Sequence, residues 1–303
     1  MSETITVELD AQYRQLREEC GLLDRSGRGK LLVSGPDAAE YLQGQLTNDV
    51  EALEPGDGQY AALLDRKGHM QADMRVLRPG EGPDLWLLLE PEGVVAASRH
   101  LQMYKIGREV EVVDASDEYA LLSLIGPRAT EIVRAVEATA LRTGEGVDLV
   151  VPVAERDQVS EALRRAGAVD VSVGAAEIVR IEAGRPRFGA EMGTATMPAE
   201  AGIVEGAVSF TKGCYIGQET VARLHYKGKP NRHLRGLRLS GPASPGEPLL
   251  LGEKEVGTVG SAAVSPAFGP IGLAILRREA DPGATLAVGE DGVTAEVVAL
   301  PFG

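Results

Sequence analysis

The sequence predicts an α+β protein with a duplicated N-terminal body and a small C-terminal β-barrel. Two segments, at 31–40 and 121–131, share one design: an apolar strand, the turn Gly-Pro-x-Ala-x-Glu, and then apolar residues at helical spacing. From residue 234 onward, short runs alternate apolar and polar residues with period two between Pro and Gly turns. The first pattern favours helices on one side of mostly antiparallel sheets, and the second is typical of a small barrel.

Local patterns predict the elements of the body in chain order. Apolar residues at helical spacing predict helices, and short apolar runs bounded by Gly or Pro predict strands. The expected helices span 12–20, 38–46 and 132–136. The expected strands span 31–33, 60–64, 70–76, 85–89 and 121–125. A third strand-to-helix unit covers 149–166, with Asp157 near the start of its helix and Gly167 just past the end.

The chain is longer than one ordinary domain. Its 303 residues exceed the roughly 100 to 200 residues of a single domain. The pattern changes after Arg232, where the strand-like alternation of 234–239 begins. We therefore expect two units: 1–230, a body of two α+β subdomains, and 231–303, a β-barrel domain.

Composition and cysteine content indicate the cellular compartment of the protein. Hydrophobic residues make up 44% and charged residues 25%, and no run approaches the ~18 apolar residues of a membrane helix. The acidic start MSETITVELD lacks the pattern of a signal peptide. Only Cys20 and Cys214 occur, which excludes a disulfide framework and a four-cysteine metal site. We expect a cytoplasmic protein with reduced thiols, no membrane contact and no bound metal.

The net charge of -14 disfavours nucleic acid as a direct partner, because sequence-independent binding depends on many Lys and Arg side chains. One stretch differs from the rest. No Asp or Glu lies between Glu219 and Glu247, whereas six Lys or Arg residues fall between Arg223 and Arg238. Two interpretations stay open: this stretch holds an anionic ligand tail or macromolecular phosphate, or it is a solvated strand edge.

Cys214 has the surroundings of a reactive cysteine. It follows Lys212 and Gly213 and precedes a helix expected to begin near Gly217, and both an ammonium group and a helix N-terminus favour a thiolate. The alternative is a small buried hydrophobe, as most free cysteines are. The flanking glycines favour an exposed turn, and hence the functional interpretation. Cys20 has no such surroundings.

Several other kinds of site lack support in the sequence. No pattern singles out a histidine partner for Cys214, so protease chemistry is unsupported. The chain has no Gly-x-Gly-x-x-Gly turn after a strand and no phosphate-binding loop of the Gly-Lys-Ser/Thr type. The scattered histidines are not at metal-ligand spacing.

The segment Lys212-Gly213-Cys214-Tyr215-Ile216-Gly217-Gln218-Glu219 resembles the defining motif of the YgfZ-type folate-binding proteins, relatives of the glycine-cleavage T-protein aminomethyltransferases. The resemblance extends over nearly the whole chain. Further similar segments lie at 41–50, 64–68, 180–184 and 198–200. The family resemblance implies three domains arranged as a ring around a folate-sized hole.

The resemblance also implies a set of site residues. Tetrahydrofolate would lie in the central channel, with a carboxylate such as Glu182 accepting hydrogen bonds from the pterin edge. The basic stretch would hold the glutamate tail. The implied binding residues are Glu182, Asn48, Tyr60, Lys212 and Arg223. The implied catalytic residues are Cys214 and Asp73.

Two departures from the T-protein pattern bear on function. T-proteins carry an Asp-Asp pair on the strand that matches 71–74, where this chain has Ala72 and Asp73, so aminomethyl transfer is doubtful on this pattern. Where T-proteins read Ile-Gly-Arg-Glu, residues 216–219 read Ile-Gly-Gln-Glu, with a cysteine added at 214. Both departures favour the YgfZ branch.

For that branch the resemblance implies a tetrahydrofolate-binding protein that supports iron-sulfur cluster assembly or repair, and thereby tRNA modification, with iron-sulfur proteins as partners. The alternative is a folate-dependent aminomethyltransferase or a demethylating one-carbon transferase that uses Asp73 as acid or base. A third hypothesis is a non-catalytic scaffold with folate as a structural ligand. Whether the chain is an enzyme stays open at this point.

Overall fold

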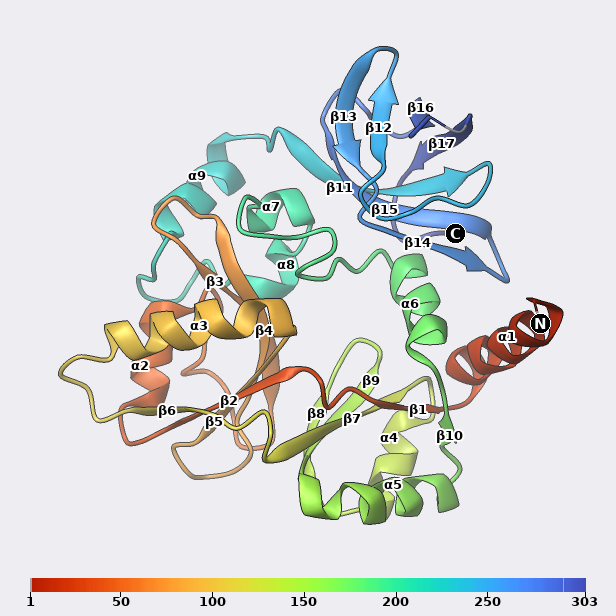
Figure 1. Cartoon of the computed structure of the whole chain (residues 1–303). Helices are drawn as coiled ribbons and strands as arrows, with labels where there is room; N and C mark the ends of the chain where they lie inside the picture. Colours follow the sequence, from red (N-terminus) through yellow and green to blue (C-terminus); the bar gives the residue numbers. More distant parts are fainter. Residues whose placement is uncertain (1, 291) are drawn as a thin grey trace.

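The computed structural model describes residues 2–290 and 292–303 and contains three β-sheets. The first sheet has the order β3-β4-β5-β2-β6, and each pair of neighbours is antiparallel. Its strands are β2 (Gly29–Ser34), β3 (Gly58–Leu64), β4 (Met70–Leu77), β5 (Leu85–Leu89) and β6 (Glu111–Asp114). Helices α2 (Ala38–Gln45) and α3 (Pro91–Tyr104) pack on one face and close a hydrophobic core with it (Figure 1).

The second sheet has the order β10-β1-β7-β9-β8. Its strands are β1 (Gly21–Asp24), β7 (Tyr119–Ile125), β8 (Thr139–Arg142), β9 (Gly146–Pro152) and β10 (Val169–Asp170). Helices α4 (Ala129–Ile132) and α5 (Arg156–Arg165) cover one face, together with the 3-10 turns η1 (Val133–Ala135) and η2 (Val153–Glu155). A separate apolar cluster that includes Trp86, Leu88, Leu121 and Val150 joins the two sheets face to face.

The repeated Gly-Pro turn forms in both sheets. It follows β2 and β7, and each of these strands lies inside its sheet. Gly35 and Gly126 both adopt positive φ, at 107° and 126°. A Cβ would lie 2.2 Å from the carbonyl oxygen of Glu109 at Gly35 and 2.6 Å from that of Glu19 at Gly126. Both turns therefore require glycine, which explains why the same motif recurs.

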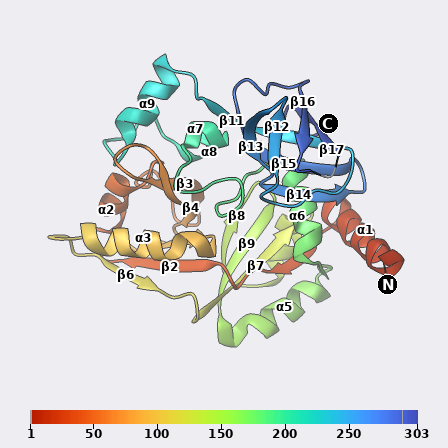
Figure 2. The same cartoon turned by 45° about the horizontal axis from the view of Figure 1, so that its top comes forward.

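The third sheet is formed by the C-terminal part of the chain, in the order β13-β12-β16-β17-β11-β15-β14. Its strands are β11 (Arg232–Leu239), β12 (Pro248–Leu251), β13 (Lys254–Thr258), β14 (Ser261–Ser265), β15 (Gly269–Arg277), β16 (Thr285–Val288) and β17 (Val293–Val298). Every neighbouring pair is antiparallel, and the sheet encloses its own apolar core. Figure 2 shows this sheet curled above the second one.

The remaining helices connect the three sheets. They are α1 (Ser2–Glu18), α6 (Val173–Glu182), α7 (Pro198–Ala201), α8 (Val204–Ala207) and α9 (Gln218–Lys227). Helix α1 lies against α6, which also contacts β14 of the third sheet (Figure 1). Among the described residues, no helix is long and apolar enough to cross a membrane.

The predicted α+β class, with a duplicated body and a C-terminal β-domain, is confirmed. Two details differ. The helix predicted at 12–20 begins at Ser2 and ends at Glu18. The helix predicted at 132–136 is a single α-turn followed by the 3-10 turn η1. The parallel pair β1 and β10, which brings 169–170 beside the start of the body, has no local sequence signal.

Candidate functional site

A cavity of about 520 Å³ lies between the first two sheets and the segment 180–206. Apolar side chains, including Leu88 and Ile203, form part of its wall. The other part is strongly charged. Its charged lining residues are Arg25, Arg28, Asp73, Arg75, Glu90, Glu145, Arg180, Arg185, Arg187 and Glu205. In the described part of the chain, no residue of the C-terminal sheet lines this cavity.

Tyr60 and Asp73, on neighbouring strands, meet inside the cavity. The Tyr60 hydroxyl donates a hydrogen bond of 2.5 Å to Oδ2 of Asp73, whereas Oδ1 has no hydrogen-bond partner among the described residues. Asp73 is only 9% exposed. Burial raises the pKa of Asp73, and the hydrogen bond from Tyr60 acts in the opposite direction. The site thus offers a carboxylate with one free oxygen that can accept an N-H donor or exchange a proton.

Ala72 faces away from this cavity. Adjacent residues of a strand point to opposite faces, and the Ala72 side chain is fully buried in the core under α3. A Cβ at Gly93 would lie 2.9 Å from the Ala72 Cβ, so the space is already filled. An aspartate at 72 would place an unpaired charge in this core. Ala72 therefore removes no carboxylate from the cavity, so this departure from the T-protein pattern gives no structural argument against transfer chemistry.

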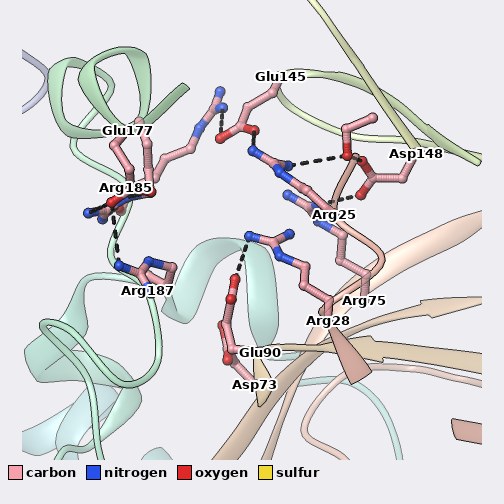
Figure 3. A network of polar contacts seen from close by, with 12 residues as sticks. Arg25, Arg28, Asp73, Arg75, Glu90, Glu145, Asp148, Glu177, Arg185 and Arg187 are labelled. Atoms are coloured by element: carbon pink, nitrogen blue, oxygen red, sulfur yellow. Dashed lines mark hydrogen bonds and ion pairs between the residues drawn. The ribbon is translucent and has the colours of Figure 1, made fainter. Parts of the chain in front are cut away.

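Glu90 is a second cavity carboxylate that sequence reasoning missed. It directly follows β5 and precedes Pro91 at the start of α3, and its Oε1 lies 2.5 Å from the Arg28 guanidinium (Figure 3). The pKa of Glu90 is raised, mainly because the carboxyl is buried. The charge of Arg28 lowers this pKa, and the nearby charge of Asp73 raises it. Glu90 could have been identified from the sequence as a charged residue that directly follows the five apolar residues of β5.

Fixed charges stabilise the cavity wall between the two sheets. Arg75 on β4 pairs with Asp148 on β9, and the Ser123 hydroxyl donates to the same carboxylate at 2.5 Å. Arg25 pairs with Glu145 at 3.3 Å. Burial alone would raise the pKa of Glu145, but Arg25, Arg75 and a third arginine lower it to about 2. Glu145 therefore stays ionised, and the ion pairs made by Glu145 and Asp148 hold the arginines in place.

A second group of arginines lies on the α6 side of the cavity (Figure 3). Arg185 pairs with Glu145 at 3.1 Å, and Arg187 lies 3.4 Å from Glu177. Both side chains remain partly exposed, and Nε of Arg187 has no partner among the described residues. These guanidinium groups can bind the carboxylates of a ligand that projects from the cavity.

The predicted binding residues Asn48 and Lys212 lie behind the cavity wall. The Lys212 ammonium is buried and donates to the carbonyl oxygens of Gln43, Leu46 and Asn48 at 2.6, 2.7 and 2.8 Å. The Asn48 amide donates to the Tyr60 carbonyl at 2.8 Å. Lys212 therefore anchors the cysteine segment to the C-terminal end of α2, and Asn48 continues the connection to the cavity strand.

Replacement of Lys212 by methionine is expected to destabilise the protein by about 2 kcal/mol. The change leaves three carbonyl oxygens without their donor, two of them able to regain water because they are only partly buried. Urea denaturation measures the loss. Lys212→Arg, which keeps a charged donor, should lose less, and equal losses in both variants would contradict an anchoring role.

Cys214 is exposed, and Cys20 is buried. The predicted helix after the motif is confirmed as α9, which begins at Gln218 directly after Gly217 in the left-handed conformation. A Cβ at Gly217 would lie 2.7 Å from the Asp65 carbonyl oxygen, so glycine is required there. The buried-hydrophobe interpretation of Cys214 is therefore wrong. Its thiol is not among the cavity residues, and its chemical role stays a prediction.

Glu182 and Arg223 lie outside the set of cavity residues. The Glu182 carboxylate is 3% exposed and accepts hydrogen bonds from Tyr13 of α1 at 3.1 Å and from Ser265 of the third sheet at 2.5 Å. Arg223 is exposed on α9. Of the residues expected from the sequence, Tyr60 and Asp73 line the cavity, Asn48 and Lys212 support it, and Glu182 joins three segments elsewhere.

Comparison with known proteins agrees with this fold. Residues 3–145 match the model of the GCVT N-terminal domain, and residues 232–302 match the glycine cleavage T-protein C-terminal barrel domain. The aminomethyltransferase of Rubrobacter xylanophilus is 31% identical, over 97% of this chain and 86% of that protein. The chain belongs to the glycine cleavage T-protein family. An aminomethyltransferase of Halothermothrix orenii is 30% identical over 96% of this chain and 90% of its own length.

The T-protein fold extends over the whole chain. The crystal structure of the glycine cleavage system aminomethyltransferase from Bartonella henselae superposes with a TM-score of 0.85, covering 97% of this chain and 89% of that one at 23% identity. The curated T-protein relatives are named aminomethyltransferases, which supports the transfer alternative better than the iron-sulfur role that the motif favours.

Proposed function

We propose that this T-protein relative binds tetrahydrofolate in the cavity and transfers a one-carbon unit, with Asp73 as the acid or base. The observation that carries the proposal is the free Oδ1 of Asp73, held by Tyr60 in a cavity with inner carboxylates and outer arginines. The aminomethyltransferase names of the relatives support the same reaction class.

The chemistry of the wall fits the parts of a folate. A reduced pterin presents N-H donors along one edge, and Asp73 and Glu90 supply acceptors for them. The apolar wall at Leu88 and Ile203 fits the flat aromatic middle of the molecule. The tail ends in carboxylates, which Arg185 and Arg187 can bind in bidentate fashion.

Asp73 has the environment of a proton-transfer group. Tetrahydrofolate supplies the nucleophilic nitrogen that accepts or releases the one-carbon unit. Burial raises the pKa of the Asp73 carboxyl toward the range in which it exchanges protons at cellular pH. Tyr60 orients the carboxylate, and the Arg28 and Glu90 pair lies beside it. In this proposal Asp73 moves the proton, and the surrounding charges position the ligand.

Calorimetric titration of tetrahydrofolate into the wild type, Arg187→Ala and Arg278→Ala tests binding. Arg278 is an exposed arginine outside the cavity and serves as the matched control. We expect Arg187→Ala to weaken binding about tenfold, as for a charge-assisted pair, and Arg278→Ala to leave it unchanged. Incubation with an aminomethyl donor, whose carbon is already at the oxidation level of the product, should then yield methylenetetrahydrofolate and release the donor's nitrogen as ammonia. Absence of binding in the wild type, or of product with every donor, rejects the proposal.

Replacement of Tyr60 by phenylalanine is expected to shift the acid limb of the pH-rate profile to higher pH. The Tyr60 hydrogen bond lowers the pKa of Asp73, so its loss raises that pKa further above 3.8. A higher pH would then be needed to deprotonate Asp73, which acts as a base only when it is ionised. Rates measured across the acid range check the shift, and an unchanged limb would mean that Asp73 is not the titrating group.

A second candidate function is support of iron-sulfur cluster assembly or repair, as the YgfZ-type motif implies. The observation that favours it is the exposed thiol of Cys214 on a segment that Lys212 and Asn48 connect to the cavity strand. One thiol cannot complete the ligand set of a cluster, so an iron-sulfur partner or a small thiol would supply the rest. In a strain lacking the protein, Cys214→Ser should fail to restore iron-sulfur enzyme activity, while Cys20→Ser should restore it. Full restoration by Cys214→Ser excludes this role.

A further inference from the structure

Unpaired cations gather on the outer face of α9. Arg223, Lys227 and Lys229 are exposed, and none of them forms an ion pair with an acid anywhere in 2–290 or 292–303. Other exposed arginines, such as Arg134 and Arg165, also have no ion-pair partner among the described residues, so what sets this stretch apart is that 220–246 contains no Asp or Glu. On a chain with a net charge of -14, this face is a local exception.

The hairpin between β3 and β4 extends this face. Its tip carries the exposed Arg66 and Lys67, again without an ion-pair partner among the described residues. Gly68 packs against α9, since a Cβ there would lie 3.0 Å from the Thr220 side chain (Figure 1, Figure 2). The neighbouring Asp65 carboxylate is occupied by two backbone amides of its own turn. We call Arg66, Lys67, Arg223, Tyr226, Lys227 and Lys229 the α9 surface.

Aromatic rings lie among these cations. The Phe210 and His225 rings stack with centroids 4.0 Å apart and an interplanar angle of 24°. Tyr226 is 68% exposed and meets both rings edge-on. A tyrosine that is 68% exposed leaves ring surface on which another flat ring can stack.

We propose that the α9 surface binds a single-stranded nucleic acid. Single strands combine closely spaced phosphates, which need cations, with unpaired bases, which stack on exposed aromatic rings. The acidic remainder of the molecule repels phosphates, so binding is confined to this face. An acidic protein partner would use the same cations but has no comparable need for an open tyrosine face. The surface lies outside the cavity lining, so this function is independent of folate binding.

Fluorescence anisotropy of a labelled oligouridylate, and of the matching deoxy-oligomer, tests the proposal over a range of salt concentrations. Binding should weaken as salt rises. In Lys227→Ala/Lys229→Ala, the slope of log affinity against log salt should fall by about 1.4, because each lost phosphate contact on a single strand removes about 0.7. Tyr226→Leu should weaken binding at least about fivefold, the effect of losing one stacked base. Preference for one of the two oligomers identifies the natural strand.

Matched controls come from the same chain. Arg277→Ala/Arg278→Ala removes two exposed cations at the end of β15, and Tyr104→Leu removes an exposed tyrosine on α3. Both should bind the oligomer like the wild type, and thermal denaturation verifies that every variant is folded. The proposal is overturned if the wild type binds no oligomer, if the controls weaken binding equally, or if poly-glutamate binds more tightly than either strand. If any of these variants loses folate binding, that result tests the proposed cavity function and not the α9 surface.

Discussion

Asp73→Asn is expected to lower the rate of one-carbon transfer about a thousandfold, within the usual range for loss of a general acid or base. Asparagine has nearly the same shape and can still accept the Tyr60 hydrogen bond, so the cavity keeps its form. Because Asn cannot exchange a proton, the thousandfold loss should appear in kcat, and because its NH2 group replaces the free acceptor Oδ1, tetrahydrofolate affinity should also fall. Single-turnover formation of methylenetetrahydrofolate measures the effect.

The same variant should be more stable than the wild type at neutral pH. Burial raises the pKa of Asp73 in the folded state above its ordinary value of 3.8. Its favourable contribution is complete below pH 3.8 and is lost as pH rises through the folded pKa, because the folded state then holds a buried charge. Asparagine does not ionise, so the variant does not lose stability as the pH rises. Urea denaturation at pH 7 and in mild acid compares the two proteins, and a variant that is inactive and also less stable at pH 7 would indicate general damage to the fold.

Glu182→Ala is expected to destabilise the protein by about 3 kcal/mol. The carboxylate joins α1, α6 and the third sheet, and its loss leaves the hydroxyls of Tyr13 and Ser265 without their acceptor in a buried joint. Chemical denaturation measures the loss. Glu182→Gln is the control, since its amide oxygen still accepts a hydrogen bond and it should bind tetrahydrofolate like the wild type. If Glu182→Gln loses folate at unchanged stability, Glu182 meets the pterin as the family resemblance implies.

The fold could be predicted because its signals are local. Gly35 and Gly126 each require a left-handed backbone beside a carbonyl oxygen, so the repeated turn is visible in the sequence. Strands β3, β4 and β5 of the first sheet follow each other along the chain and are separated by Gly turns. The β1 and β10 pair joins residues almost 150 positions apart, as from Gly21 to Val169, and no local pattern signals such a contact.

The site residues were harder to predict, because the direction in which each side chain points decides whether it reaches the cavity. Asp73 and Ala72 differ by one position and point to opposite faces of β4, so only the register separates a cavity carboxylate from a core position. Arg180 and Glu182 are two residues apart on α6, about 200° around the helix. Arg180 lines the cavity, and Glu182 therefore points toward α1. Residue types alone could not distinguish these cases.

Hydrogen bonds from Lys212 to Asn48 and from Asn48 to Tyr60 connect the cysteine segment to the strand that lines the cavity. The Asn48 side chain is bonded to the strand that carries the cavity tyrosine, and its carbonyl oxygen is bonded to the lysine two positions before the exposed thiol. A ligand that shifts the backbone of β3 at Tyr60 would strain these bonds, whereas rotation of the Tyr60 side chain alone would leave them intact, because Asn48 donates to the Tyr60 carbonyl oxygen. When a ligand shifts this strand, we expect the rate at which Cys214 reacts with an alkylating reagent to change, because Lys212 lies two positions before the exposed thiol.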